Sequence, residues 1–423
     1  MTGLNIPPAA SRRTFLRGAG GLAVLGATGA AAAACGNNGG SGGSGELQQW
    51  YHQYGEKGTE QAAKKYAAAY KKKKVQVNWK VGDYGTLLSA ALLGRNVPDV
   101  FESQFNIQLV HSKQVVPLDD IIGDAKSDFS DIDIQTNSLD GKLYGIRMID
   151  DPQLLYYRKS LLQNAGLQPP STIEELINAT NELAKGKMKG LFAGNDAGAG
   201  AFGIVALHAA GGQQLTPDNK PGFTGDDAIE AYSSLRTLGK SKGLLMGAPT
   251  DWTDPGSFLN ELCAMQWCGM WAMPQIEAKF KDDFGVIPFP KIGAAGKPIV
   301  YTGGWTAFVA AKSKNQDAAK AFLKWLWIDQ EKFQEDWSLN YGFHIPPRKS
   351  LAAKATKLQS GAAAETVKLN SQYGMADNPT WTPNVGAPYG DMLTNIVRKG
   401  NDPKKETAKA AKLVQTQLKR LLG

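Results

Sequence analysis

The order of apolar and polar residues after position 45 alternates between strand-like and helix-like segments. Apolar side chains alternate strictly with polar ones in Val75–Val81, which predicts a strand, and two further strands are predicted at Glu46–Tyr51 and Val97–Phe101. Helical periodicity between these segments predicts helices over Thr59–Lys73 and Thr86–Leu93. Strands that alternate with helices are typical of parallel sheets with right-handed crossovers, so the pattern predicts an α/β fold.

The same alternation continues along the rest of the chain. Ser171 or Thr172, followed by Glu174 or Glu175, predicts a capping box at the start of a helix, because the two side chains satisfy each other's free N–H groups. The other predicted elements are strands at Lys189–Ala193 and Phe284–Pro288 and helices at Gly203–Ala210, Asn315–Gln330 and Thr407–Leu422.

The first 45 residues have the composition of an export signal and a linker. Arg12 and Arg13 precede an uncharged, weakly apolar stretch, which predicts a twin-arginine signal peptide over residues 1–34. The stretch ends Ala32-Ala33-Ala34-Cys35, which resembles a bacterial lipoprotein signal and implies that Cys35 carries the lipid. Residues 35–45 contain almost only Gly, Ser and Asn, so we expect a flexible tether. The protein is therefore expected on the outer face of the cytoplasmic membrane, held there by its lipid.

Charge and composition exclude several classes of protein. The chain has 423 residues, 42% of them hydrophobic, which is typical of globular proteins and not of disordered ones. Its formal net charge of +8 falls to about +5 when the three arginines of the signal peptide are removed. The basic run Lys71–Lys74 suits the C-terminal end of a helix, where cations interact favourably with the helix dipole. A nucleic-acid partner is therefore not expected.

The cysteines and histidines do not form a recognisable metal-binding pattern. The chain has three Cys and four His without metal-ligand spacing, so we expect no bound metal and no cofactor. Calcium in the acidic segment Asp124–Asp133 remains an alternative, although the spacing there matches no known calcium loop. Cys263 and Cys268 would lie about 16 Å apart in an extended strand, too far apart for a disulfide. We expect two small buried side chains.

An ordered set of short motifs resembles the extracytoplasmic solute-binding proteins of carbohydrate ABC transporters, with maltose-binding protein as a distant relative and an actinobacterial branch as the most similar. The motifs lie in order across nearly the whole mature chain. They are Trp50–Glu56, Pro98–Glu102, Val116–Asp119, Asp140–Ile146, Tyr156–Ser160, Ala165–Leu167, Pro170–Leu176, Cys263–Trp271, Gly303–Trp305 and Ala318–Leu323.

This resemblance implies a two-lobed periplasmic-binding-protein fold of the class II type. Each lobe would be a mostly parallel sheet flanked by helices, with a ligand cleft at the hinge. We expect residues 46–150 and 302–348 in lobe 1 and residues 151–301 and 349–423 in lobe 2, with hinge crossings near Asp150, Tyr301 and Arg348. It also implies a monomer without catalytic activity that closes around a sugar and delivers it to an ABC permease.

A sugar site needs aromatic faces for the C–H surfaces of the rings and planar polar groups for the hydroxyls. In an open α/β sheet such residues are expected in the loops after the strands. Trp271 and Trp305 are placed in the site by the motifs of the family, and a rough alignment adds Tyr389 and Arg348. The full set of expected ligand-binding residues is His52, Glu56, Asp83, Tyr84, Glu102, Gln104, Asp150, Asp151, Asn195, Asp196, Trp271, Trp305, Arg348 and Tyr389.

Other aromatic and glycine residues have a structural explanation. The spacing of Trp79, Trp325 and Trp327 places them on strand or helix faces, so we expect them in the core, whereas Trp267 fits either the core or the site. Gly198–Gly203 matches G-x-G-x-x-G between a strand and a helix. A dinucleotide fold also needs an acidic residue at the end of the next strand, which is missing, so we expect the glycines to allow close approach of a ligand.

Several functional alternatives stay open at this point. An exported glycoside hydrolase could use Glu56 and Glu102 as its acid and base. A cell-wall protein associated with carbohydrate is a third reading. The number of candidate aromatic residues favours a disaccharide or short oligosaccharide as ligand, but a sugar acid remains an alternative, because His52 and Arg348 would suit a carboxylate.

Overall fold

The computed structural model describes residues 45–423. Its strands are β1 (Leu47–His52), β2 (Val75–Lys80), β3 (Val100–Ser103), β4 (Ser138–Leu139), β5 (Lys142–Leu143), β6 (Ile146–Tyr157), β7 (Lys189–Phe192), β8 (Cys263–Gly269), β9 (Gly285–Ile287), β10 (Val300–Val309) and β11 (Gly374–Met375).

The α-helices are α1 (Thr59–Ala69), α2 (Tyr84–Leu93), α3 (Ile107–His111), α4 (Asp119–Ile122), α5 (Asp131–Thr136), α6 (Lys159–Asn164), α7 (Ile173–Glu182), α8 (Ala199–Ala209), α9 (Asp226–Gly239), α10 (Gly256–Leu259), α11 (Met273–Phe280), α12 (Gln316–Lys324), α13 (Glu331–Leu339), α14 (Lys349–Lys354), α15 (Gly361–Tyr373), α16 (Pro383–Val397) and α17 (Pro403–Leu422). Short 3₁₀ or π turns are η1 (Gly123–Asp128), η2 (Met270–Ala272), η3 (Trp325–Asp329) and η4 (Thr356–Leu358).

The locally predicted elements are present, with shifted ends. The expected capping box forms with Thr172 as the N-cap of α7 and Glu175 as its reciprocal partner. Strand β3 begins only at Val100, because Pro98 has no N–H to donate to a sheet. Helix α1 ends at Ala69, so the lysines at 71–74 follow the helix instead of forming its last turn.

One mixed sheet connects the two halves of the fold. Its strand order is β2-β1-β3-β10-β6-β8-β7. The outer strands are parallel, since β1 pairs in parallel with β2 and β3 and β7 with β8. The central pairs are antiparallel, because β10 runs against both β3 and β6, and β6 runs against β8. The α/β prediction is thus confirmed, but antiparallel pairs replace parallel ones in the middle of the sheet.

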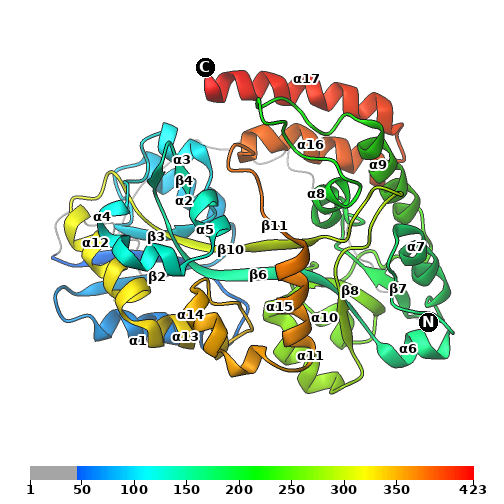
Figure 1. Cartoon of the computed structure of the whole chain (residues 1–423), viewed down its shortest axis with the longest axis horizontal. Coiled ribbons are helices and arrows are strands. Elements are labelled where there is room, and N and C mark those ends of the chain that lie inside the picture. The colour runs from blue at the N-terminus through cyan, green and yellow to red at the C-terminus, as the bar shows by residue number, and fades with distance from the viewer. Residues whose placement is uncertain (1–44) are drawn as a thin grey trace, which may run out of the picture. The chain divides into compact units, whose positions relative to one another are not determined.

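Separate hydrophobic clusters form on the two sides of the long central strands β6 and β10. The first cluster packs α1, α12 and α13 around β1, and it includes Ile149 from the start of β6. A second cluster packs α7, α8, α9, α16 and α17 together, and it includes Leu155 from later in the same strand. A third cluster lies between β8, α11 and α15. Within residues 45–423, Figure 1 shows β6 and β10 running between the helices of the first and second clusters.

The tryptophans and cysteines outside the site are packed as core residues. Trp327 is fully buried and Trp79 and Trp325 are partly buried against the first cluster, which confirms the prediction for these three. Trp267 is fully buried, and its Nε1 donates to Gln153.

Cys263 and Cys268 both lie on β8 as free, buried thiols, as predicted from their spacing. Burial raises the pKa of both thiols, which makes them poor nucleophiles. Within the described chain, none of the helices has the length and apolar character needed to cross a bilayer. Residues 45–423 also contain no group of three or more His, Cys, Asp or Glu arranged to hold a metal ion.

Candidate binding site

A cavity of about 730 Å³ is lined by residues that belong to different core clusters. One wall is formed by the end of β1 and the loop after it, residues 52–56, together with Gln104 and Trp305. Another wall is formed by the start of α8, by the loop 252–255 and by Trp271. The strands β6 and β10 contribute Asp151, Gln153, Tyr301, Gly303 and Gly304, and His344 completes the lining.

The first wall is aromatic and rests on a buried carboxylate. The ring of His52 stacks on Trp305 with centroids 3.9 Å apart and an interplanar angle of 20°, and Tyr54 lies 3.9 Å from the same imidazole. Glu102, almost completely buried at the end of β3, accepts a 2.7 Å hydrogen bond from the Tyr54 hydroxyl and lies 2.6 Å from His52 Nδ1. Burial and the charge of Glu102 raise the pKa of Tyr54, which therefore remains a hydrogen-bond donor.

The second wall contains two further tryptophans. Trp271, in the turn η2, donates from Nε1 to the carbonyl of Thr253 at 3.0 Å, which fixes the orientation of its indole ring. The ring of Trp252 lies 6.4 Å from that of Trp271. Asp254 follows in the same loop, and its carboxylate accepts a hydrogen bond from the N–H of Gly256 at 2.7 Å. Both walls therefore offer flat apolar surface next to polar groups, which is what a sugar ring requires.

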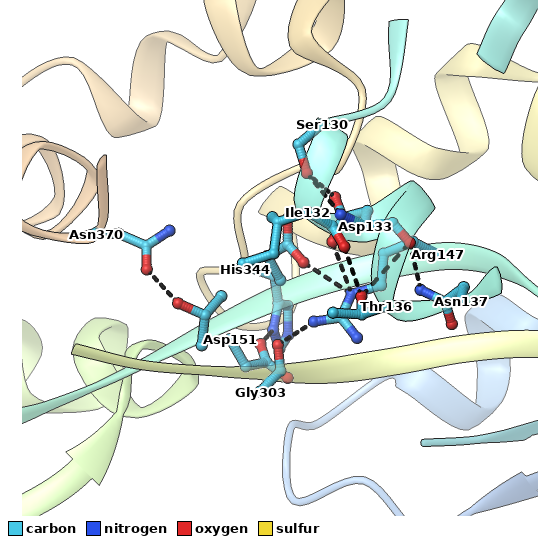
Figure 2. Close-up of polar contacts among 12 residues, drawn as sticks. Ser130, Ile132, Asp133, Thr136, Asn137, Arg147, Asp151, Gly303, His344 and Asn370 are labelled. Atoms are coloured by element: carbon cyan, nitrogen blue, oxygen red, sulfur yellow. Dashed lines mark hydrogen bonds and ion pairs between the residues drawn. The ribbon is translucent and has the colours of Figure 1, made fainter. Parts of the chain in front are cut away.

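A buried histidine joins two carboxylates at the base of the cavity. His344 Nδ1 contacts Asp151, and its Nε2 lies 3.1 Å from Glu56 Oε1 (the Asp151 contact is visible in Figure 2). Burial by itself lowers the pKa of an imidazole, but Asp151 and then Glu56 outweigh burial and raise the pKa of His344 to about 10. The group therefore carries a positive charge at neutral pH that both acids share.

The start of helix α8 approaches the cavity through small residues. Gly200 and Ala201 line the cavity, and Gly198 adopts the left-handed conformation with φ +83°. The carboxylate of Asp196 accepts hydrogen bonds from the N–H groups of Gly198 at 3.0 Å and Gly200 at 2.7 Å. As expected from the sequence, the glycines bring the backbone close to the cavity, and the Asp196 carboxylate already binds the N–H of Gly200 in the first turn of the helix.

A smaller hollow of about 160 Å³ adjoins the cavity and shares Gln104, Tyr301, Gly303 and Gly304 with it. Arg147 lines this hollow, and Figure 2 shows its guanidinium among Asp133, Gly303 and neighbouring groups. Its Nε donates to Asp150 at 2.7 Å and lies 3.6 Å from Asp133. Burial and the nearby Asp133 raise the pKa of Asp150 to about 8 despite the contact with Arg147.

Six of the fourteen residues expected from the sequence line the cavity. These six are His52, Glu56, Gln104, Asp151, Trp271 and Trp305. Three others lie directly behind the wall and hold it. Glu102 binds His52 and Tyr54, the Tyr84 hydroxyl donates to the carbonyl of Glu102 at 2.8 Å, and Asp150 binds Arg147.

The remaining five expected residues do not line the cavity, and their side chains make structural contacts elsewhere. Asp83 caps α2 by accepting from the N–H of Thr86, and Asp196 caps α8. Asn195 holds the loop 248–250 through hydrogen bonds to its backbone. Tyr389 is buried in α16 and donates to the carbonyl of Gly203 at 2.9 Å.

Arg348 is the fifth of these residues, and its guanidinium is held by an acidic pair. Its Nε lies 2.8 Å from Asp128 and its Nη2 lies 3.1 Å from Glu331, while Nη1 donates to the carbonyl of Ile328. This arrangement joins α14 to η1 and to the start of α13. The side chain is therefore not available to a carboxylate in the cavity.

Three of the lining residues that were not among the expected ones are Trp252, Asp254 and His344. Trp252 and Asp254 lie in a segment rich in Asp, Thr and Pro that has no periodic pattern, and His344 lies in an irregular segment between α13 and α14. A tryptophan within a polar loop is the one local signal that could have indicated Trp252. His344 could not be found locally, since its partners Glu56 and Asp151 are far away in sequence.

Comparison with known proteins identifies the family that this chain resembles. Residues 56–327 match the family described as bacterial extracellular solute-binding protein. The diacetylchitobiose binding protein DasA of Streptomyces coelicolor is 27% identical over 355 residues, which cover 79% of this chain and 80% of DasA.

Two solved structures have the same two-lobed fold. The GacH receptor of Streptomyces glaucescens, solved unliganded and with acarbose, gives a TM-score of 0.75 at 24% identity and covers 89% of this chain and 99% of its own. UgpB of Mycobacterium tuberculosis, solved with glycerophosphocholine, gives a TM-score of 0.73 at 19% identity and covers 90% of this chain and 100% of its own. The two-lobed α/β architecture expected from the sequence is thereby confirmed.

Proposed function

This chain belongs to the family of bacterial extracellular solute-binding proteins, and we propose that it captures a di- or oligosaccharide in the cavity and delivers it to an ABC import permease. The observation that carries the proposal is the pairing of two tryptophan-bearing walls with a base of carboxylate and amide groups. Sugar rings pack on indole faces through their C–H surfaces, while their hydroxyls donate to carboxylates. The cavity volume of about 730 Å³ lies within the range of small-molecule sites.

The names of similar proteins support a sugar ligand. DasA is named for diacetylchitobiose, and the GacH receptor was solved with acarbose. The lobes in this proposal are residues 46–150 with 302–348 and residues 151–301 with 349–423. Closure would bring the wall of Trp305 toward the wall of Trp271, with β6 and β10 as the connecting strands.

Membrane attachment is a separate part of the proposal. Cys35 and the preceding signal lie outside the described residues, so their support comes from the sequence alone. We infer that Cys35 carries a lipid and that residues 36–45 tether a monomeric binding protein to the outer face of the membrane. In fractionated cells, Cys35→Ala should move the protein out of the membrane fraction, and its retention there would contradict the anchor.

Glu56 and Glu102, the candidate acid and base of a glycoside hydrolase, are not arranged as a catalytic pair. Glu102 is buried behind the wall with both oxygens occupied, by His52 and by Tyr54, and it does not line the cavity. Glu56 and the neighbouring Asp151 both contact the same histidine. We therefore propose binding without turnover.

A thermal-shift panel of neutral di- and trisaccharides tests the proposal. A ligand present at about 100 times its dissociation constant should stabilise the protein by about 2.7 kcal/mol. Chromatography of the same mixtures should show intact sugar after long incubation. Trp271→Ala should weaken binding about tenfold or more, because a stacked aromatic face contributes roughly 1 kcal/mol beyond its buried area.

The matched control is Trp50→Ala. Trp50 is a half-buried tryptophan that lies under Lys80 and does not line the cavity. It should leave the dissociation constant unchanged. If no sugar in the panel stabilises the protein, or if the bound sugar is cleaved, the proposal is wrong.

A further inference from the structure

The charges of the cavity are unevenly distributed. Glu56, Asp151 and Asp254 line it, and none of the described lining residues is a lysine or an arginine. No lysine or arginine among the described residues forms an ion pair with Asp254, whose carboxylate is bound only to a backbone N–H. Arg147 in the adjoining hollow also interacts with the charge of Asp151, but it is paired with Asp150 and lies near Asp133, so it does not balance Glu56 or Asp254.

The two histidines of the lining are already engaged. His52 Nδ1 lies 2.6 Å from Glu102, and the backbone N–H of His52 donates to the same carboxylate. His344 contacts Asp151 and Glu56 together, so its single positive charge faces two acids. Both histidines therefore already contact carboxylates of the protein.

The usual backbone site for an anion, the start of helix α8, already holds a carboxylate of the protein. The start of a helix attracts anions through its free N–H groups, and α8 begins at the cavity after a glycine-rich loop. Here the carboxylate of Asp196 accepts from the N–H groups of Gly198 and Gly200, so a negative charge already lies at the helix start. A phosphate or carboxylate of a ligand would have to displace it.

The cavity instead offers unused hydrogen-bond acceptors. Glu56 and Asp151 are both more than nine-tenths buried, and each uses one oxygen for His344. Within the described residues, no hydrogen bond reaches Oε2 of Glu56 or Oδ2 of Asp151. Both residues line the cavity, so hydroxyl or ammonium donors of a ligand could bind these oxygens.

From these features we propose that the cavity selects a saccharide without negative charge, neutral or amino-bearing, and rejects uronic acids and phosphate esters. This inference rests on the proposed function and specifies its substrate class. Glu56, Asp151 and Asp254 determine the selection. A ligand anion about 8 Å from one unbalanced carboxylate is repelled strongly enough, at an effective dielectric constant near 20, to weaken binding by roughly tenfold or more.

The experiment compares three forms of the best-binding sugar from the neutral panel. They are the sugar itself, its 6-carboxylate obtained by oxidation of a primary hydroxyl, and the methyl ester of that acid. The acid and the ester are nearly equal in size and differ in charge, so the ratio of their dissociation constants isolates electrostatic selection. Isothermal titration should give an acid that binds at least about tenfold more weakly than the ester.

Two variants that each remove one negative charge show which carboxylate causes the discrimination against the acid. Asp254→Asn retains an oxygen that can accept from Gly256, and it should reduce the ratio between acid and ester severalfold. Asp131→Asn removes one carboxylate that is 92% exposed and does not line the cavity, and it should leave the ratio unchanged. An acid that binds as tightly as the ester would overturn this inference while sugar binding itself stands. A panel without any sugar ligand contradicts the proposed function first, and this inference with it.

Discussion

The imidazole of His52 lies against the indole of Trp305, with ring centroids 3.9 Å apart. The two residues come from β1 and β10, strands that are separated by some 250 positions along the chain and joined in the sheet through β3. Glu102 on β3 holds the imidazole in place. The orientation of this wall is thus set by a residue that a ligand does not touch.

Replacing Glu102 by glutamine should disturb the wall without removing any of its rings. The charged acceptor of His52 and Tyr54 becomes neutral and accepts at one oxygen only, so we expect a loss of about 2 kcal/mol in the free energy of unfolding. Sugar affinity should fall severalfold because the wall is less well ordered. Urea denaturation and titration calorimetry measure the two effects, and an unchanged unfolding free energy would show that Glu102 does not hold the wall.

The pKa of His344 predicts how stability depends on pH. Its folded-state pKa of about 10 lies above the ordinary value near 6.5, so the folded protein holds a proton that the unfolded chain releases. The stabilisation is fully present below pH 6.5, falls by at most about 1.4 kcal/mol per pH unit above it, and is lost once the pH passes 10.

Comparison with His344→Gln isolates this contribution, because Asp150, whose pKa is also raised, is present in both proteins and cancels in the difference. The melting temperature of the wild-type protein should exceed that of the variant most at pH 6, and the gap should narrow steadily toward pH 10. A gap that stays constant over this range would show that the histidine is not charged in the folded state.

Gly304 should not tolerate a side chain, whereas its neighbour should. Gly304 has φ +134°, and a Cβ there would lie 2.1 Å from the carbonyl oxygen of Ile149. Gly304→Ala should therefore destabilise the protein by roughly 2 kcal/mol or more, through strain between β10 and β6. A Cβ at Gly303 would have no atom nearer than 3.4 Å, so Gly303→Ala serves as the control. Its free energy of unfolding should lie within about 1 kcal/mol of the wild-type value. Equal melting temperatures for the two variants would contradict this difference.

Arg348→Ala should affect stability and leave ligand binding unchanged. The guanidinium is buried between Asp128 and Glu331, but Ser350 continues to bind Asp128 and Glu331 is half exposed. We expect a loss of about 2 kcal/mol in unfolding free energy, less than for a fully buried pair. Titration of the same sugar should give the wild-type dissociation constant at a temperature where both proteins are folded. A large loss of affinity would place Arg348 back in the site.

Local patterns in the sequence were enough to predict many elements. Strict alternation identified β2, and the spacing of Thr172 and Glu175 identified the start of α7, since both signals lie within a few residues. Family motifs placed Trp271 and Trp305, and both line the cavity. Trp271 lies in the turn after β8 and Trp305 lies within β10.

Other features depend on contacts that are distant in sequence. The antiparallel pairing of β6 with β10 joins segments about 150 residues apart, and nothing near either strand indicates it. Tyr389 points into the core because α16 packs against α8, and a sequence alignment does not show which face of a helix is buried. Arg348 is bound by Asp128, 220 residues earlier in the chain, so its partner could not be read from its neighbours.

The shared central strands also determine when this protein can fold. The core around Leu47 and Tyr66 is completed by Phe322 and Trp337, which are synthesised more than 250 residues later. A growing chain that has not yet reached β10 leaves the apolar faces of β1 and α1 uncovered, because their packing partners do not exist. The N-terminal segment can therefore complete its core only after the C-terminal third of the chain has been synthesised. Chaperones and the export machinery encounter either an incomplete chain with exposed apolar surface or the finished protein.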